Sequence, residues 1–209
     1  MDDSCLAYTV EPMTLLDVPA VVALEKKVFS MPWSAHAFEY ELQFNPRAHF
    51  WVVRPRGQTQ GASGGVHPNG PHRWQSAGRA ARGPILGYAG LWLIVDEAHV
   101  CTLAVDTDWR RRGLGELLLV HLIEGATALD AAFLTLEVRV SNLAAQALYS
   151  KYGFVGAGLR KGYYSDNHED ALIMSTELIT SAALQQRFER LKSLLQRRLA
   201  TQPVDQLRI

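Results

Sequence analysis

A basic, glycine-containing turn between an apolar strand and a helix is the segment best suited to bind phosphate. Residues 105–115 read VDTDWRRRGLG, and an apolar helical repeat follows directly. Gly113 and Gly115 lack Cβ atoms, so a diphosphate could approach their backbone, and the N–H groups that open the helix would hold its charge. Arg111 and Arg112 could add charge-assisted hydrogen bonds to outer phosphates. A run of solvated arginines before an ordinary helix explains the same residues equally well.

Competing phosphate and metal motifs fit the sequence less well. It contains no G-x-x-x-x-G-K followed by Ser or Thr, and no G-x-G-x-x-G at its first strand-to-helix turn. H-E-x-x-H and C-x-x-C are also missing and the seven histidines are scattered, so we expect no metal site. Cys5 and Cys101 are expected to be reduced thiols, and Cys101 has no adjacent His that would activate it as a nucleophile.

Strand and helix signals alternate along the chain and predict one α/β domain around this turn. Apolar or alternating segments predict strands over residues 6–10, 50–53, 85–95, 99–105, 133–138, 154–164 and 170–178. Helical spacing predicts helices over residues 14–29, 113–129 and 142–152, and another from after Ser34 to about Phe44. A docked amphipathic helix is expected in the tail, with one apolar face formed by Leu184, Phe188, Leu191, Leu195 and Leu199.

The net charge of zero conceals an uneven distribution. Residues 54–84 hold five Arg, seven Gly, four Pro and no acid, which predicts a flexible basic loop. The tail, residues 178–209, holds six basic side chains against Glu189 and Asp205. The remaining body therefore carries a formal charge of −9, which would attract a cationic substrate. We expect residues 1–177 to form a single domain interrupted by this loop, and residues 178–209 to be an amphipathic extension.

Size and composition exclude several classes of protein. The 209 residues are 48% hydrophobic and 20% charged, ordinary values for a globular domain that needs neither disulfide nor metal to fold. Net zero charge argues against a wholly basic nucleic-acid binder and against a disordered polyelectrolyte. The longest apolar run, residues 85–95, is half the roughly 20 residues of a membrane helix. The acidic start of the chain lacks signal-peptide features, so a cytoplasmic protein without membrane contact is expected.

The turn and the segments around it resemble the GNAT superfamily of N-acetyltransferases. A strand, R-x-x-G-x-G and a helix resemble the acetyl-CoA signature of that family. The segments LEVRVSN at 136–142, ALY at 147–149 and YGF at 152–154 match the second half of the fold in order and spacing. RKGYY at 160–164, EDALIM at 169–174 and MPWS at 31–34 complete a resemblance to the RimI branch. These bacterial enzymes acetylate the N-terminal alanine of small-subunit ribosomal protein S eighteen. The resemblance covers residues 5–53 and 85–177.

The resemblance implies a mixed, mostly antiparallel central sheet flanked by helices and splayed at the acetyl-CoA site. It also implies direct attack of an amine on the thioester, with Glu137 as general base and Tyr149 as general acid. A phenol with a pKa near 10 stays protonated at neutral pH and can reprotonate a thiolate. From the residues alone, Glu137 could instead be a strand-end carboxylate paired with Arg139, and Tyr149 a core tyrosine.

Matching positions also imply coenzyme and acceptor contacts. The strand Leu103–Ala104–Val105 would offer backbone groups to the pantetheine arm, and Asn142 would contact CoA, although helix capping also explains it. Walls for the acceptor are expected from Trp33, Tyr163 and Tyr164, with Glu25 as a further candidate. The remaining expected coenzyme contacts come from the turn and the start of its helix: Arg110, Arg111, Arg112, Gly113, Leu114, Gly115 and Glu116.

Three functions remain open at this point, two of them acetyltransferases and the third from another class. The first is N-terminal acetylation of ribosomal protein S eighteen, with acetyl-CoA as co-substrate. The second is acetylation of other protein N-termini, of lysines or of a small-molecule amine. The third is a ribosome- or RNA-binding module that uses the basic loop and tail, whose binding would weaken steeply with salt.

Overall fold

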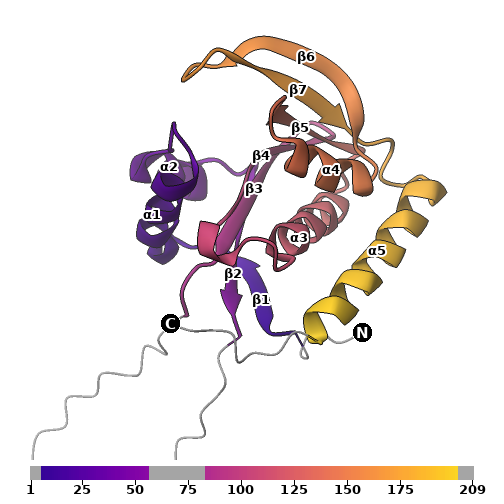
Figure 1. Ribbon diagram of the computed structural model, residues 1–209, viewed down its shortest axis with the longest axis horizontal. Coiled ribbons are helices and arrows are strands. Elements are labelled where there is room, and N and C mark those ends of the chain that lie inside the picture. The colour runs from indigo at the N-terminus through magenta and orange to yellow at the C-terminus, as the bar shows by residue number, and fades with distance from the viewer. Residues whose placement is uncertain (1–5, 57–82, 202–209) are drawn as a thin grey trace, which may run out of the picture.

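The computed structural model describes residues 6–56 and 83–201, and its centre is one mixed seven-stranded sheet (Figure 1). The strands lie in the order β1-β2-β3-β4-β5-β7-β6. All neighbours are antiparallel except β4 and β5, which are parallel. This confirms the mostly antiparallel sheet expected from the sequence. The strands are β1 (Tyr8–Pro12), β2 (Ala48–Pro55), β3 (Gly87–Ile94), β4 (Glu97–Val105), β5 (Phe133–Arg139), β6 (Val155–Tyr164) and β7 (Glu169–Ser175).

Helices cover both faces of the sheet (Figure 1). On one face, α1 (Val18–Val28) and α2 (Ala35–Phe44) bury Leu24 and Phe38 against Val52 of β2. On the other, α3 (Leu114–Ala128) and α4 (Leu143–Lys151) share a larger core with Val53 and with β3, β4 and β5. Adjacent residues of β2 thus enter opposite cores, as alternation along a strand requires.

Helix α5 (Ala182–Ala200) lies against the outer side of α3, in the part of the chain that the resemblance does not cover (Figure 1). Its buried side chains are the five apolar residues that repeat at helical spacing in the sequence, and four of them belong to the same core as α3. Along the described ranges 6–56 and 83–201, no helix has the length and apolar character needed to span a membrane.

The parallel strands β4 and β5 stay together for only part of their length. Four residue pairs join them, from Glu97 opposite Phe133 to Val100 opposite Leu136. Strand β4 then continues to Val105 beside β3, whereas β5 continues beside β7. The sheet therefore opens between β4 and β5, which is the splay expected from the sequence.

The boundary expected for the basic loop is wrong at its N-terminal end. Arg54 belongs to β2 and is buried, with 7% of its surface exposed. Its guanidinium binds Glu11 of β1 at 2.7 Å and Asp17, just before α1, at 2.5 Å, and also donates to the carbonyl of Gly83. The count of arginines by segment did not reveal that Arg54 is buried. A single charged side chain in a strand can face inward when acidic side chains on neighbouring elements pair with it. The loop arginines Arg73, Arg79 and Arg82, and also Cys5, lie outside the described residues.

Replacing Arg54 should test how strongly this buried pair holds β1, β2 and α1 together. Arg54→Met leaves the carboxylate of Asp17, 2% exposed, without its guanidinium partner. We expect the free energy of unfolding to fall by about 3–5 kcal/mol, because a buried carboxylate loses its cationic partner. Urea unfolding followed by circular dichroism measures this change. The matched variant Arg56→Met should cost less than about 0.5 kcal/mol, and equal losses in the two variants would contradict the interpretation.

Candidate active site

The basic turn after β4 is fixed from two sides. Asp106 caps a short 3-10 helix (Thr107–Trp109) by accepting the N–H of Asp108. Lys27 of α1 reaches across and binds Asp106 at 2.6 Å and Asp108 at 2.7 Å, so the first helix holds the turn in place. The guanidinium of Arg112 lies over the Trp109 ring, 4.6 Å from its centroid. These contacts give the turn a defined shape.

The start of α3 has the geometry of an anion site. Gly113 precedes the helix with a φ of +86°, a left-handed conformation that favours glycine. The N–H of Leu117 donates to the Gly113 carbonyl at 2.9 Å. The N–H groups of Leu114, Gly115 and Glu116 come before the first such donor and so have no acceptor within the helix. Together with the helix dipole they favour a bound phosphate.

The side chain of Glu116 is committed to protein partners. Its carboxylate accepts from the Tyr152 hydroxyl at 2.9 Å, from Arg198 of α5 at 2.6 Å and from Lys151 of α4. Burial alone would raise the pKa of the Glu116 carboxyl, but the hydrogen bonds from Lys151, Arg198 and Tyr152 outweigh it and hold the pKa below its usual value. The side chain of Glu116 is therefore occupied, and its backbone N–H is the group that can contact the coenzyme.

One edge of β4 is open beside this turn. Beyond Val100, the residues of β4 pair with β3 and, among the described residues, with no strand on the other side. Leu103, Ala104 and Val105 therefore have an edge toward β5 from which their backbone groups can bind an extended ligand. The family resemblance implies an edge of this kind for a pantetheine arm.

Glu137 is the first residue of β5 past the point where the strands part. Its side chain is 8% exposed, and its two oxygens have different partners. Oε1 lies 3.1 Å from Arg160 Nη2 of β6, and Oε2 lies 3.2 Å from His99 Nε2 of β4. The alternative pairing with Arg139 is not what the structure shows, because Arg139 instead binds Asp166 and Glu169.

Tyr149 of α4 is buried, and its ring centroid lies 5.7 Å from that of Phe154. Burial, and secondarily the nearby Tyr164 phenol, raise the pKa of Tyr149 to about 12. The hydroxyl therefore stays protonated at any working pH. Asn142 uses its side chain to cap α4, accepting the N–H of Ala145 at 3.2 Å, which matches the capping alternative for that residue.

An aromatic row connects the first helices to Glu137. Trp33, after α1, stacks on Trp92 of β3 at 6.0 Å, and Trp92 stacks on His99 at 6.0 Å. At the other end of the site, Tyr163 and Tyr164 meet edge to face at 5.2 Å. Tyr163 is 46% exposed, whereas the Tyr164 ring lies 3.8 Å from the Arg139 guanidinium. The three aromatic residues expected to form walls thus flank the strand that carries Glu137.

Glu25 and Cys101 do not fill the roles considered for them. Glu25 is 2% exposed and accepts the hydroxyl of Tyr88 inside the core beneath α1, so it is not a wall of an open site. Burial raises the pKa of Glu25 and outweighs the hydrogen bonds from Tyr88 and the Trp33 backbone. Burial likewise raises the pKa of the Cys101 thiol well above its ordinary value, which suppresses the nucleophilic thiolate.

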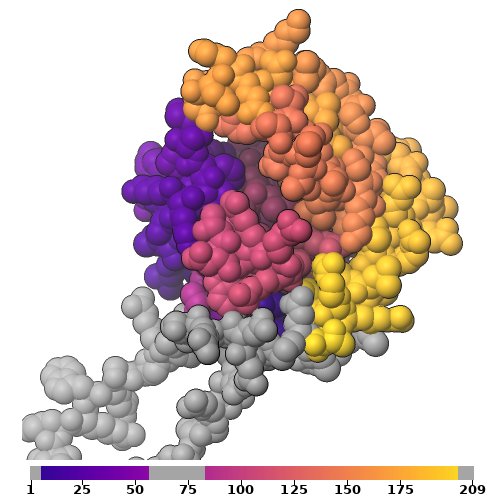
Figure 2. Space-filling model, in the orientation of Figure 1, coloured from indigo at the N-terminus to yellow at the C-terminus, as the bar shows by residue number. Residues whose placement is uncertain are grey.

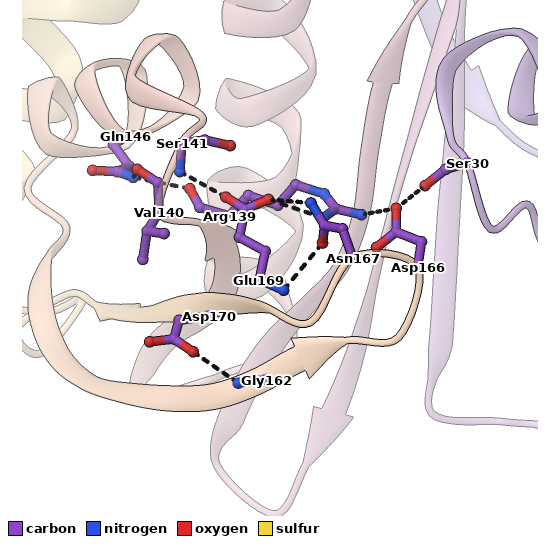
Figure 3. Close-up of polar contacts among 10 residues, drawn as sticks. All are labelled: Ser30, Arg139, Val140, Ser141, Gln146, Gly162, Asp166, Asn167, Glu169 and Asp170. Carbon is purple, nitrogen blue, oxygen red and sulfur yellow. Dashed lines mark hydrogen bonds and ion pairs between the residues drawn. The ribbon is translucent and has the colours of Figure 1, made fainter.

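The β6–β7 hairpin is anchored over the site by one arginine (Figure 3). The guanidinium of Arg139 binds Asp166 at 2.7 Å, and Asn167 and Glu169 at 3.0 Å. Asp166 also accepts the hydroxyl of Ser30, in the segment between α1 and α2. The hairpin and the first two helices are therefore joined across the open face of the sheet. Figure 2 shows the hollow that α1, α2, the basic turn and α4 surround.

Sequence reasoning missed several of these groups. His99 and Arg160 touch Glu137, and Arg198 touches Glu116, yet none of the three was assigned a role beyond its motif or segment. The alternation of β4 could have placed His99 on the face opposite α3. Its neighbour on β5 depends on the parallel register, which no local signal reveals. No three His, Cys, Asp or Glu side chains gather as a metal site would require in the described part of the chain.

Comparison with known proteins gives a consistent set of relatives. The model of the acetyltransferase (GNAT) family matches residues 18–154. A Bacillus subtilis protein, provisionally named as a ribosomal protein bS18-alanine N-acetyltransferase, is 36% identical over 79% of this chain and 92% of its own length. The Escherichia coli enzyme of that name is 32% identical over 80% and 95%. The crystal structure of an Escherichia coli ribosomal-protein-alanine N-acetyltransferase superposes with a TM-score of 0.64 at 31% identity, covering 84% of this chain and 96% of that one. The resemblance drawn from the sequence is thereby confirmed.

The anchor of the hairpin predicts a dependence of stability on pH. Hydrogen bonds from the Ser141 hydroxyl and N–H, then from Arg139 and Asn167, lower the pKa of Glu169 to about 2 from its usual 4.5. Its contribution to stability is therefore complete above pH 4.5 and is lost as the pH falls toward 2. Glu169→Gln should unfold at lower urea than the wild type at pH 7, and the difference should shrink as the pH falls below 4.5.

The control for this measurement is Glu177→Gln, which changes an exposed glutamate just after the same hairpin. It should leave the urea midpoint close to that of the wild type at every pH. A constant difference between Glu169→Gln and wild type from pH 7 to pH 3 would show that the carboxylate charge does not carry the effect.

Proposed function

Because the chain belongs to the GNAT family of acetyltransferases, and so is an acetyl-CoA-dependent N-acetyltransferase, we propose that its acceptor is the N-terminal alanine of ribosomal protein bS18. The observation that carries this proposal is the 32–36% identity to relatives named for that reaction, over more than nine-tenths of their length. A ribosomal substrate is consistent with a cytoplasmic enzyme.

The described residues fit acetyl-CoA at two places. The open edge of β4 at Leu103–Val105 can pair with the amide groups of the pantetheine arm. The turn and the first N–H groups of α3 can receive the diphosphate, with Arg110, Arg111 and Arg112 near its charge. When bound, the coenzyme supplies an acyl group already activated as a thioester, so an amine can attack it without a covalent enzyme intermediate.

Glu137 is the proposed general base. An α-ammonium group with a pKa near 7.7–8.0 costs only about 1 kcal/mol to deprotonate near pH 7, so a modest base suffices. The position of Glu137 at the fork between β4 and β5 supports this role, since an extended ligand along β4 would bring its thioester to the same point. Arg160 keeps the carboxylate oriented by binding Oε1.

Tyr149 is the proposed general acid for the departing CoA thiolate. Its raised pKa of about 12 means that the proton is present when the C–S bond breaks, and a thiolate can then take it. Burial against Phe154 restricts the ring, which helps aim the hydroxyl. Asn142 would cap the start of α4 through its side-chain oxygen. The side-chain NH₂ group would then be available to contact CoA.

The acceptor is proposed to enter between the aromatic residues that flank Glu137. Trp33 on one side, and Tyr163 and Tyr164 on the other, provide apolar walls for a short side chain such as alanine. The formal charge of −9 on the body outside the two basic segments favours approach of a cationic N-terminus.

Docking to the ribosome or to RNA through the basic segments stays a prediction. Two of the basic side chains of the tail already have partners within the protein: Arg198 binds Glu116, and Lys192 binds Glu124 at 2.5 Å. These two contacts reduce the positive charge that the tail offers to phosphate.

The proposed function is tested with acetyl-CoA and a hexapeptide that copies the N-terminus of bS18. We expect Glu137→Gln and Tyr149→Phe each to lower kcat about 100-fold or more, since each removes one proton transfer. Release of the CoA thiol gives the rate, and mass spectrometry of the peptide identifies the acetylated amine. Both variants should bind acetyl-CoA with wild-type affinity.

Free lysine and a hexapeptide with a blocked N-terminus and an internal lysine serve as controls for the acceptor. Neither should be acetylated at a comparable rate. Rapid acetylation of lysine or of a small amine, with the bS18 peptide unmodified, would assign the enzyme to another acceptor.

The network around Glu116 predicts that α5 influences coenzyme binding. Arg198→Ala removes one of two cations from a carboxylate in the first turn of α3, where the diphosphate is proposed to bind. The freed negative charge should weaken acetyl-CoA binding by about 0.5–1.5 kcal/mol, or roughly two- to thirteenfold. Isothermal titration calorimetry measures this change.

A second substitution separates charge from packing in this experiment. Glu116→Gln in the Arg198→Ala background removes the unbalanced charge and should return the affinity to near the wild-type value. Arg197→Ala, which changes the exposed neighbour on α5, should leave it unchanged. A double variant as weak as Arg198→Ala would refute the electrostatic explanation.

A further inference from the structure

We propose that His99, Thr135 and Glu97 form a relay that carries to solvent the proton that Glu137 takes from the acceptor amine. This inference rests on the proposed base role of Glu137. The three residues lie outside the motifs that carry the family resemblance, and the proposed function does not use them.

The relay is continuous along one face of the sheet. His99 and Thr135 are directly opposite each other across the parallel pair β4 and β5, and Glu97 and Glu137 lie two residues away on the same face of their strands. Starting from Glu137 Oε2, the next atom is His99 Nε2 at 3.2 Å, and the other ring nitrogen, Nδ1, lies 3.0 Å from Thr135 Oγ1. Thr135 then donates its hydroxyl proton to Glu97 Oε1.

The chemistry of each group sets the direction of these hydrogen bonds. An ionised carboxylate only accepts, so the Thr135 hydroxyl donates to Glu97 and its oxygen is left to accept from His99 Nδ1–H. The direct distance from Nδ1 to Glu97 is longer, at 3.5 Å, which makes the hydroxyl the bridging group. His99 Nε2 then faces Glu137 Oε2 with its lone pair and can receive the proton that Glu137 takes from the amine.

The stoichiometry of the reaction requires such an exit. The acceptor enters as an ammonium ion with three N–H protons. The amide product keeps one, the CoA thiol receives one through Tyr149, and one must reach solvent in each turnover. No oxidant, metal or further reactant is needed, because only protons move along the relay.

Burial makes direct release from Glu137 slow. Its side chain is 8% exposed and both oxygens are engaged, whereas the side chain of Glu97 is 33% exposed. A proton that arrives on Glu137 passes to His99 Nε2 as Nδ1–H passes its own proton to Thr135, and the Thr135 hydroxyl proton passes to Glu97. Loss of that proton to water leaves the His99 proton on Nε2, and exchange with solvent through its partly exposed ring returns it to Nδ1 before the next turnover.

Neighbouring side chains hold the groups of the relay in position. Trp92 stacks parallel to the His99 ring, with an angle of 14° between the planes, and so restricts its rotation. Arg160 holds the opposite oxygen of Glu137. Protons enter and leave on different nitrogens of one ring, so each passage inverts the tautomer of His99 and the ring is reset by proton exchange with solvent. His99 is thus a positioning and relay residue, and Glu137 alone is proposed to meet the substrate.

The experiment interrupts the relay at Thr135 and at His99, neither of which is proposed to contact acetyl-CoA or the peptide. Thr135→Val keeps the shape of the side chain and removes the bridging hydroxyl, and His99→Gln removes the ring that exchanges protons. Each should lower kcat for the bS18 hexapeptide about tenfold, less than the hundredfold or more expected for loss of a general acid or base, because Glu137 itself remains. The KM values for peptide and acetyl-CoA should stay within about twofold of wild type.

Rescue by a diffusible base distinguishes proton transfer from structural damage. Adding imidazole should raise kcat of Thr135→Val and His99→Gln toward the wild-type value and leave the wild type unchanged. His121→Gln and Thr127→Val, which alter the same residue types on α3, should keep wild-type kcat and show no response to imidazole.

The outcomes separate the relay from the base assignment. If Glu137→Gln is inactive while Thr135→Val and His99→Gln retain wild-type kcat, the base role stands and the relay is refuted. A fall in kcat that imidazole does not reverse also refutes the relay. If Glu137→Gln retains wild-type kcat, the proposed base is wrong, and the relay falls with it.

Discussion

Strands β4 and β5 run parallel and share only four residue pairs before they separate. Within residues 6–56 and 83–201, the separation leaves backbone groups of β4 without a neighbouring strand at an edge that would otherwise be inside the sheet. Such groups are costly to leave unpaired in a protein interior, so an extended ligand with amide groups of its own is a natural partner. The same separation brings Glu137 to the tip of the gap and directs β4 into the turn that opens α3. The proposed coenzyme edge, general base and phosphate site therefore all depend on one departure from regular pairing.

Both sides of the gap are supported independently. On the β4 side, α1 and α2 pack on one face and α3 on the other, and Lys27 connects α1 to the turn. On the β5 side, Arg139 gathers the acids of the β6–β7 hairpin, and Asp166 carries the connection on to Ser30. Because each side has its own core or ion-pair cluster, the two halves of the sheet can part without either losing its packing.

The sequence predicted the strands and helices well because the spacing of apolar residues within a segment determines which of the two it forms. Apolar alternation and helical spacing located the strands and helices, and the positive φ of Gly113 agrees with a glycine-started helix after a tight turn. Side-chain partners were harder to foresee, since they depend on register between distant segments. Glu137 pairs with Arg160 and His99 rather than with nearby Arg139, and Arg54 is buried by acids from β1 and from the entrance to α1. For Glu137, partners on neighbouring strands replace the chain neighbour that the sequence suggested, and for Arg54, a buried place in a strand replaces the expected place in a loop.

Helix α5 is the last of the described elements to be synthesised, and the rest of the chain cannot complete its packing without it. Leu195 and Leu199 are buried against α3, and Leu199 and Arg198 occupy the space beside Gly113. The strands and helices of the catalytic body are all synthesised before α5, yet the surface next to the phosphate turn is closed only when this helix arrives. Until then, the apolar side of α3 is exposed and Glu116 lacks one of its two cations. A chain that ends before α5 would thus contain all seven strands of the sheet, but its proposed coenzyme site would be unfinished and an apolar surface of α3 would be exposed.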